Sequence, residues 1–295
     1  MFKIHKISIL SSFIGLWLTS YLNKEAQFFV GFLLILSFGI LHGANDLVLI
    51  NQLNIENKPK SFVKLLISYL IIVFSAVVLF VFIPTLAMVL FIIISAYHFG
   101  EQHWQKLKEQ QSELITVIFQ LNYGLFILFL LFIFHSKEVI EIVYNITTLR
   151  VGSLFITIVF FASSILLASL LLYISNKNSE FKKNIPEQLI YLVVFAVIFK
   201  VGSLIWAFTI YFILWHSIPS LNDQIKFLYG NYSFKNFTTY FKSAFLYWIV
   251  SLLGIGLLYY FFRDQRLFEA LFFSFLAAIT FPHAWVILKM FKNKV

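Results

Sequence analysis

Apolar segments of about 20 residues recur along almost the whole chain. A helix of that length crosses the hydrocarbon core of a bilayer and satisfies its own backbone hydrogen bonds there. The sequence therefore predicts eight to ten membrane-spanning helices, near 7–22, 26–49, 62–83, 85–104, 113–134, 152–174, 186–199, 203–221, 240–262 and 267–288. The segment 186–199 is short and only Lys200 and Gly202 stand out between it and 203–221, so this pair could also be one broken or re-entrant segment.

The composition agrees with a membrane protein. Of the 295 residues 61% are hydrophobic and only 12% are charged, whereas soluble domains are about one quarter charged. We expect an all-α fold, a polytopic transmembrane helix bundle that forms a single integral membrane domain over residues 1–295. No cleavage site of the A-x-A type follows the first apolar run, so we interpret it as a membrane helix and not as a signal peptide.

The formal net charge of +9 comes from Lys and Arg residues that lie between the apolar segments. With ten spans and a cytoplasmic N-terminus, sixteen of the 22 basic residues fall on the cytoplasmic side and six on the outer side. Cytoplasmic loops carry an excess of positive charge, so this bias predicts that both termini lie in the cytoplasm. Because the basic residues lie between apolar segments, we interpret the positive charge as a sign of a multi-pass protein of the inner (cytoplasmic) membrane and not of a nucleic-acid-binding protein.

The seven histidines differ in their predicted depth. His5 lies in the N-terminal tail and His135 at an outer helix end, where solvated side chains without a special role are expected. The other four lie in the latter parts of even-numbered helices, and ten-span topology brings them to a similar depth in the cytoplasmic half of the membrane. These four are His42, His98, His216 and His283.

Two interpretations of the deep histidines stay open. Ionisable groups are costly inside a membrane and usually face the bundle interior, so each histidine could be a hydrogen-bonded packing residue. Alternatively, the four could share a metal ion, since neutral imidazole is the commonest transition-metal ligand and suits iron, zinc or copper. The chain has no cysteine, which excludes thiolate zinc sites and iron–sulfur clusters.

Three acidic residues follow these histidines at helical spacing. Asp46 is four residues after His42, which puts both on one face of a helix. Its carboxylate could accept a hydrogen bond from a ligand imidazole of its own or of an adjacent helix and fix the tautomer of that ring. Glu101 and Asp223 follow His98 and His216 by three and seven residues, and they could instead mark helix ends at the water interface.

Small residues and prolines beside the histidines could shape the helices. Gly43 and Gly100 would let a neighbouring helix or a flat ligand approach the backbone. Pro219 and Pro282 each remove a helical hydrogen bond and could kink the helix next to a histidine.

Several functional classes can be set aside or kept open. The chain has no HExxH zinc-protease motif and no Walker or dinucleotide-binding glycine motif. A transporter that uses the histidines and Asp46 for metal or proton passage stays open, although the outer halves of the even-numbered helices are nearly all apolar.

Four segments taken together, "HGANDL", "SAYHFGEQHW", "WHSIPSLNDQ" and "FPHAWV", resemble the Brp/Blh family of bacterial and archaeal membrane carotene dioxygenases. The resemblance implies cleavage of β-carotene by O2 at its central 15,15′ double bond, with non-haem iron, Fe(2+), to give two molecules of retinal. Such retinal typically supplies a microbial rhodopsin. The match assigns iron-ligand roles to His42, His98 and His216.

The chain departs from the family pattern at one expected ligand. The family has a second histidine four residues after the third, where this chain has Ser220. His283 is our candidate for the missing ligand, and a water molecule or Asp46 are the alternatives. Ser220 could also mark a degenerate site, in which case the chain would be a non-catalytic carotenoid- or rhodopsin-associated protein.

Aromatic residues near the histidines could line a tunnel for the polyene. The chain is 20% aromatic, and our candidates are Tyr97, Trp215 and Trp285. Phenylalanine is also ordinary lipid-facing filler, so an aromatic composition does not by itself indicate a substrate tunnel.

Overall fold

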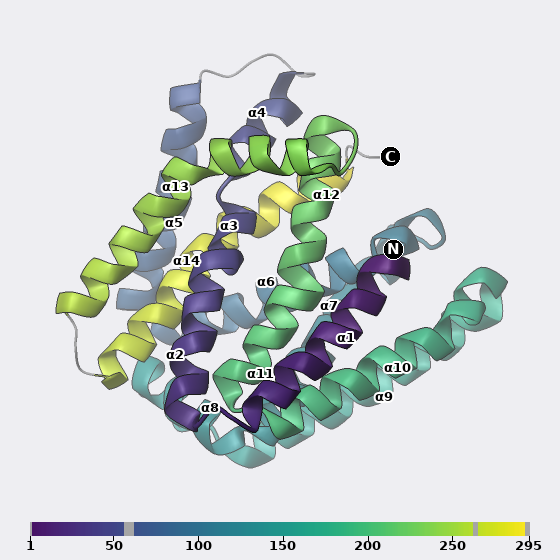
Figure 1. The fold of residues 1–295 in the computed structure, drawn as a ribbon. Coiled ribbons are helices and arrows are strands. Elements are labelled where there is room, and N and C mark those ends of the chain that lie inside the picture. Colours follow the sequence, from purple (N-terminus) through teal and green to yellow (C-terminus); the bar gives the residue numbers. More distant parts are fainter. Residues whose placement is uncertain (1, 56–61, 262–264, 293–295) are drawn as a thin grey trace. The chain divides into compact units, whose positions relative to one another are not determined.

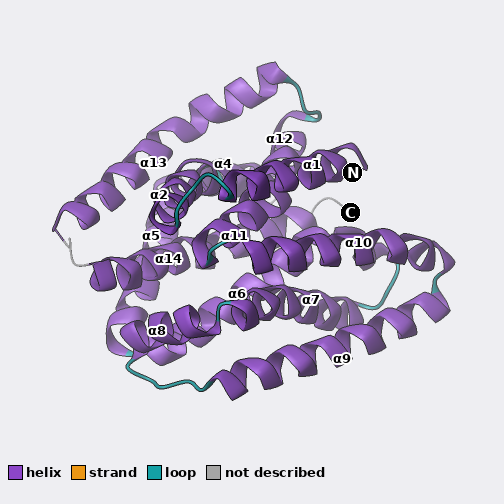
Figure 2. Ribbon diagram, turned by 60° about the horizontal axis from the view of Figure 1, so that its bottom comes forward, coloured by secondary structure: helices purple, strands orange, loops and turns teal. Residues whose placement is uncertain are grey.

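A computed structural model describes residues 2–55, 62–261 and 265–292. Within these ranges the chain forms helices joined by short loops and contains no β-strand (Figure 2). This confirms the all-α fold.

Nine helices in the described ranges are long and apolar enough to cross a membrane, which confirms a polytopic helix bundle. They are Lys24–Leu53, Val63–Phe82, Pro84–His103, Glu113–Phe134, Ser153–Lys177, Ser179–Val201, Leu204–Tyr229, Phe234–Leu257 and Ser274–Lys292. The N-terminal helix α1 (Phe2–Thr19), which we expected to be the first span, is not among these nine.

The structure has two separate spans near residue 200, so the alternative of one broken or re-entrant segment is wrong, and the first span is longer than the expected 186–199. Helix α10 (Ser179–Val201) has 23 residues, and a second full-length span begins at Leu204. The helix starts before its apolar part because the Asn178 side chain accepts a hydrogen bond of 2.9 Å from the Phe181 N–H. A count of apolar residues alone misses the polar first turns that this cap stabilises.

The contacts divide the chain into two compact units that interleave along the sequence. Unit 1 comprises Met1–Leu34, Ser95–Glu141 and Arg150–His216, and unit 2 comprises Ile35–Ile94, Ile142–Leu149 and Ser217–Val295. Each unit therefore consists of three separate chain segments. The single membrane domain over residues 1–295 stays a prediction.

In unit 1, α7 (Glu113–Phe134) packs against α9 (Ser153–Lys177), and α10 packs against both (Figure 1). Helix α6 (Pro84–His103) approaches α7 at backbone contact. A Cβ on Gly100 would lie 1.8 Å from the Gln120 carbonyl oxygen, and one on Gly124 would lie 1.8 Å from that of Ala96. The expectation that Gly100 admits a neighbouring helix is thus confirmed, with a second glycine in the reciprocal position on α7.

In unit 2, α5 (Phe62–Phe82) packs against α14 (Gln265–Lys292), and α4 (Asp46–Ile55) contacts both (Figure 1). Their shared core contains Leu49, Leu65, Val286 and Met290. Helices α12 (Ile218–Tyr229) and α13 (Phe234–Phe261) pack against α3 (Ile40–Gly43). These contacts place α3 and α14, which carry His42 and His283, in one folded unit.

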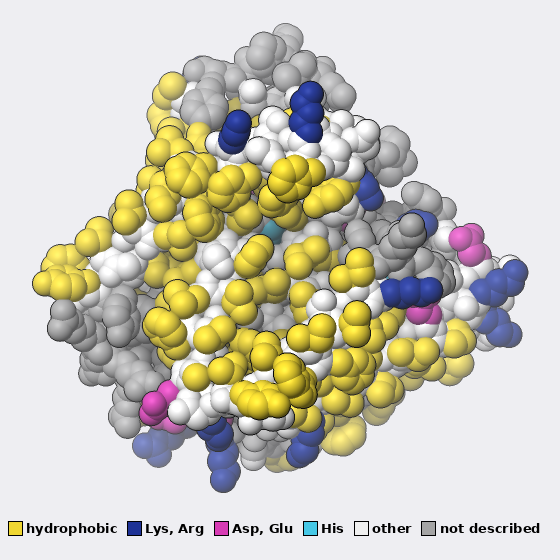
Figure 3. All heavy atoms as spheres, in the orientation of Figure 1, with side chains coloured by type: hydrophobic (Ala, Val, Ile, Leu, Met, Phe, Trp, Pro, Cys, Tyr) yellow, Lys and Arg dark blue, Asp and Glu magenta, His cyan; other side chains and the backbone are white. Residues whose placement is uncertain are grey.

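Large apolar side chains are exposed on several helices at spacings of three or four residues. Hydrophobic side chains accordingly cover much of the face drawn in Figure 3. Such stripes would be aggregation-prone in water but are suited to lipid contact. The exposed residues include Val63, Ile67, Leu70 and Phe74 on α5, Leu154, Ile158, Phe161 and Ile165 on α9, and Leu246, Val250, Leu253 and Leu257 on α13. The chain is a multi-pass membrane protein.

The orientation of the chain stays a prediction. Four of the basic residues that we counted for it, Lys58, Lys60, Arg263 and Lys294, lie outside the described residues.

Candidate metal centre

The helix that carries His42 is interrupted on both sides of this residue. A π-helical segment, Ile35–Gly39, precedes α3, and the turn Ala44–Asn45 separates α3 from α4. The expected continuous helix, with His42 and Asp46 on one face, is therefore wrong. Asn45 holds the turn, since its side-chain amide donates to the Tyr240 carbonyl at 2.9 Å and its Oδ1 accepts from the Ser243 hydroxyl at 2.9 Å.

The interruption leaves the His42 carbonyl without the Asp46 N–H that a continuous helix would provide. Two buried side chains replace it: Gln224 Nε2 donates to the His42 carbonyl at 2.8 Å, and the Tyr240 hydroxyl lies 3.3 Å from it. The same hydroxyl donates to Gln224 Oε1 at 2.7 Å. Residues of α12 and α13 thus hold the backbone at His42 in place.

Asp46 contacts His283 and Tyr69. His283 Nδ1 lies 2.8 Å from Asp46 Oδ1, and the Tyr69 hydroxyl donates to Asp46 Oδ2 at 2.9 Å. Because a carboxylate only accepts, the Nδ1 of His283 donates in this bond, and the neutral form of the ring then has its lone pair on Nε2. Asp46 therefore orients an imidazole on a neighbouring helix, which is one of the two arrangements that the spacing allowed.

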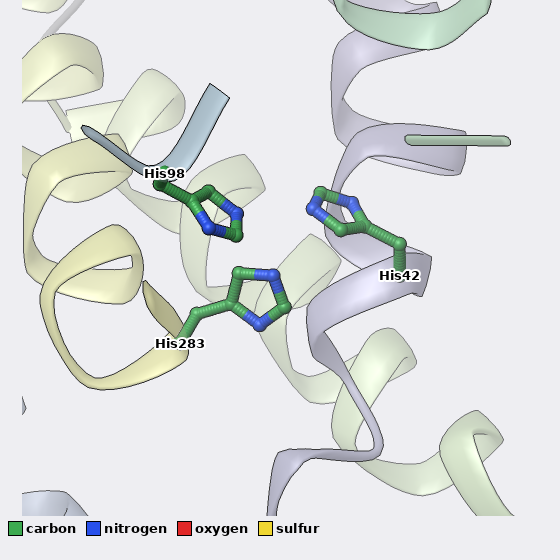
Figure 4. Close-up of side chains that lie close together, drawn as sticks. All are labelled: His42, His98 and His283. Carbon is green, nitrogen blue, oxygen red and sulfur yellow. The ribbon is translucent and has the colours of Figure 1, made fainter. Parts of the chain in front are cut away.

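The His42 and His283 rings form an edge-to-face pair in unit 2 (Figure 4). Their centroids are 4.8 Å apart with an interplanar angle of 88°, and both residues are buried. A Cβ on Gly43 would lie only 3.5 Å from His283 Nδ1, so this ring packs against the backbone of α3.

Unit 1 contains a second buried histidine pair. The His98 and His216 rings have centroids 4.7 Å apart and an interplanar angle of 79°. His216 lies in a π-helical segment, Phe212–Ser217, and Gln102 Nε2 donates to its carbonyl at 2.9 Å. The Phe99 ring lies 4.7 Å from the His216 ring. One π-helical segment thus contains His216, and the other ends shortly before His42. Such segments are frequent at functional sites.

The remaining predicted site residues differ in burial. Glu101 is fully buried and 3.4 Å from the Tyr97 hydroxyl, so it does not mark a helix end at the water interface. Ser220 is also fully buried, and its hydroxyl accepts from Gln224 Nε2 at 3.1 Å. Asp223 is half-buried on α12.

The donor set suits a metal ion. The buried histidines His42, His98 and His283 each offer an imidazole nitrogen that could bind one (Figure 4). Metal-bound histidines usually donate their second ring N–H to a carboxylate or a carbonyl, and His283 has such a partner in Asp46. Neutral imidazoles in apolar surroundings favour iron, zinc or copper over magnesium or calcium.

The three aromatic tunnel candidates lie in different environments. Trp215 is buried, and its indole donates to the Ser12 hydroxyl at 2.9 Å. Tyr97 is half-buried. Trp285 is 44% exposed, and Lys289 Nζ lies 3.9 Å from the centroid of its ring. A cavity of about 170 Å³ in unit 1 is lined by other residues, among them His5, His103 and Tyr191.

Sequence reasoning missed the residues that hold the candidate ligands. Gln102 and Gln224 follow His98 and His216 in the sequence, but each donates to the carbonyl of a histidine on another helix, His216 and His42 respectively. Tyr69 and Tyr240 are far from any candidate ligand in the sequence. The available signal was weak: Gln102 and Gln224 lie within the same motifs as the histidines, and Tyr69 is a polar side chain in an apolar segment.

The chain was compared with protein families, curated proteins and solved structures. The beta-carotene 15,15'-dioxygenase family matches residues 33–291, which include all four buried histidines and Asp46. Comparison with curated proteins and with solved structures gives no match. Because the match covers most of the chain, the protein belongs to the beta-carotene 15,15'-dioxygenase family.

Proposed function

We propose that the protein is a membrane-embedded non-haem iron dioxygenase that cleaves β-carotene at its central 15,15′ double bond. The observation that carries this proposal is that the family match encloses two buried histidine pairs within apolar helices.

His42, His98, His216 and His283 are the proposed ligands of one Fe(2+) ion. The donor chemistry fits because all four are buried and Asp46 accepts the Nδ1–H of His283, which leaves its Nε2 lone pair for coordination. With His283 in the set, the serine at position 220 does not deprive the metal of a fourth nitrogen.

The reaction consumes one O2 and one alkene. The carbon–carbon double bond breaks, each of its two carbons receives one oxygen atom, and two identical aldehydes form without any net proton transfer. Bound iron supplies the redox chemistry that ground-state O2 needs to react with a closed-shell hydrocarbon.

The protein's own residues position the reactants and exclude water. β-Carotene is a rigid hydrocarbon that dissolves in the bilayer, and the exposed apolar stripes keep the helices in the same phase. Apolar side chains such as Phe99 and Phe212 contact the His216 imidazole and keep its surroundings dry. Orientation of the double bond in such a site contributes through proximity and requires no general acid or base.

Expression in a β-carotene-producing bacterium tests this function. We expect the orange carotene to disappear and retinal to accumulate in pigment extracts. Unchanged carotene at good protein levels would refute the dioxygenase and favour a non-catalytic carotenoid-binding protein. A histidine-lined transporter would instead alter cellular metal content without forming retinal.

The setting of the reaction is part of the proposal. The proposed location is the inner (cytoplasmic) membrane, where the retinal product would be available to a microbial rhodopsin in the same membrane. Fractionation of the expressing cells tests the location.

A further inference from the structure

We propose that Tyr69 is a positioning residue for the metal, which acts through Asp46 on His283. This inference deepens the proposed function, because it rests on His283 being a metal ligand. Tyr69 lies on α5, Asp46 at the start of α4 and His283 on α14, and all three belong to unit 2.

The Asp46 carboxylate is held by a donor on each oxygen. His283 Nδ1 lies 2.8 Å from Oδ1, and the Tyr69 hydroxyl lies 2.9 Å from Oδ2. Asp46 is 2% exposed and His283 is 4% exposed, so water does not compete for these bonds. Hydrogen bonds in such low-dielectric surroundings are strong, and one donor on each oxygen fixes the plane of the carboxyl group.

Fixing the carboxylate fixes the imidazole. With Oδ2 bound to Tyr69, Oδ1 has one orientation toward Nδ1, so the ring of His283 keeps a single tautomer and a single rotation. The ring also packs against Gly43, where a Cβ would be 3.5 Å from Nδ1, and against the His42 ring. His283 therefore presents Nε2 in one direction before a metal arrives, which lowers the cost of binding.

The aromatic ring of Tyr69 packs against the buried core of unit 2. Its neighbours Ser68 and Leu70 are exposed and α5 carries a lipid-facing stripe, yet the Tyr69 hydroxyl is directed inward to a buried acid. Phenylalanine would fill the same space against this core but would leave Asp46 Oδ2 without its donor. The hydroxyl is thus explained by its bond to Asp46.

A double-mutant cycle on iron affinity tests the proposal in the purified full-length protein. Iron dissociation constants are measured by competition with a chelator for wild type, Tyr69→Phe, Asp46→Ala and the double variant. Removing the Asp46 carboxylate should weaken binding by about 10- to 100-fold. Tyr69→Phe should weaken it by about tenfold, since a hydrogen bond to a charged group is lost.

The double variant separates positioning from a general structural role. If Tyr69 acts through Asp46, Tyr69→Phe has no further effect on affinity in the Asp46→Ala background. The absorption bands of bound cobalt(II) should shift in Tyr69→Phe for the same reason. Asp46→Asn, which keeps an acceptor for Nδ1–H, provides a milder variant if Asp46→Ala does not fold.

Tyr123→Phe is the matched control. Tyr123 is 2% exposed, and its hydroxyl has no hydrogen-bond partner in the described part of the chain. The Tyr123→Phe protein should bind iron with the same dissociation constant as wild type.

Equal iron affinity in wild type and Tyr69→Phe overturns the proposal, as does an unchanged Tyr69→Phe effect in the Asp46→Ala background. These results are independent of the carotene assay. Intact β-carotene with an iron-loaded wild-type protein overturns only the proposed reaction.

Discussion

Gly124→Ala tests whether the close approach of α6 and α7 positions His98. The new Cβ would lie 1.8 Å from the Ala96 carbonyl oxygen, 2.4 Å from its carbonyl carbon and 2.7 Å from its Cα. These are backbone atoms, so no side-chain rotation relieves the overlap. The two helices must separate by about 1 Å or more, because packed interiors tolerate little overlap.

The expected loss of stability follows from two opposing effects. Overpacking of a close contact costs about 1–3 kcal/mol, and more where the backbone has to move. Alanine in place of glycine in a helix interior returns about 1 kcal/mol through its higher helix propensity. We expect a net loss of about 1–2 kcal/mol, which lowers the melting temperature of a chain of this size by a few degrees.

Gly254→Ala on α13 is the matched control, because no atom lies within 4 Å of the Cβ that it would add. It should gain up to about 1 kcal/mol. Both variants are measured by thermal unfolding in the same detergent, with iron content determined in parallel. Because α6 carries His98, Gly124→Ala should also bind less iron. A Gly124→Ala protein as stable as the Gly254→Ala protein would refute the packing argument.

Three further predictions concern the ligands, their supports and pH. Alanine at a proposed ligand should abolish bound iron, measured by mass spectrometry of the purified protein; the ligand variants are His42→Ala, His98→Ala and His216→Ala. The control variant His135→Ala should retain its iron. Gln224→Leu should lower the unfolding free energy by about 1–3 kcal/mol, because the buried His42 carbonyl loses its main donor, and Tyr240→Phe should lower it less. Burial lowers the pKa of His135, against the opposing effect of its hydrogen bond to the Phe199 carbonyl. Protonation therefore favours the unfolded chain, so stability should fall as the pH drops below about 6.5, and His135→Gln should reduce that fall in melting experiments at several pH values.

Hydrophobic patterning predicted the helical class and most of the spans, since a membrane helix requires a run of apolar residues. It placed His42, His98, His216 and His283 in separate helices, and each is buried. It missed the start of α10 because polar first turns carry no apolar signal, and it missed the break at Ala44–Asn45 because Tyr240 and Ser243, about 195 residues away, stabilise that turn.

The residues that hold the candidate ligands could not be predicted from local sequence either, because they lie far from those ligands along the chain. Asp46 was identified from its spacing to His42, but its partners are Tyr69 and His283, which are 23 and 237 residues away. Such pairings depend on which helices pack together. The π-helical segments beside His42 and His216 likewise depend on tertiary contacts, such as the bond of 2.8 Å from the Trp248 indole to the Ser37 carbonyl.

The central claim is tested most directly by product analysis with the purified protein, loaded with iron and supplied with β-carotene and O2. Iron-loaded protein should form retinal as the single carotenoid product, with two molecules of retinal for each carotene consumed, and the iron-free protein should form none. Intact carotene, or two apocarotenals of unequal length, would contradict central cleavage by this protein.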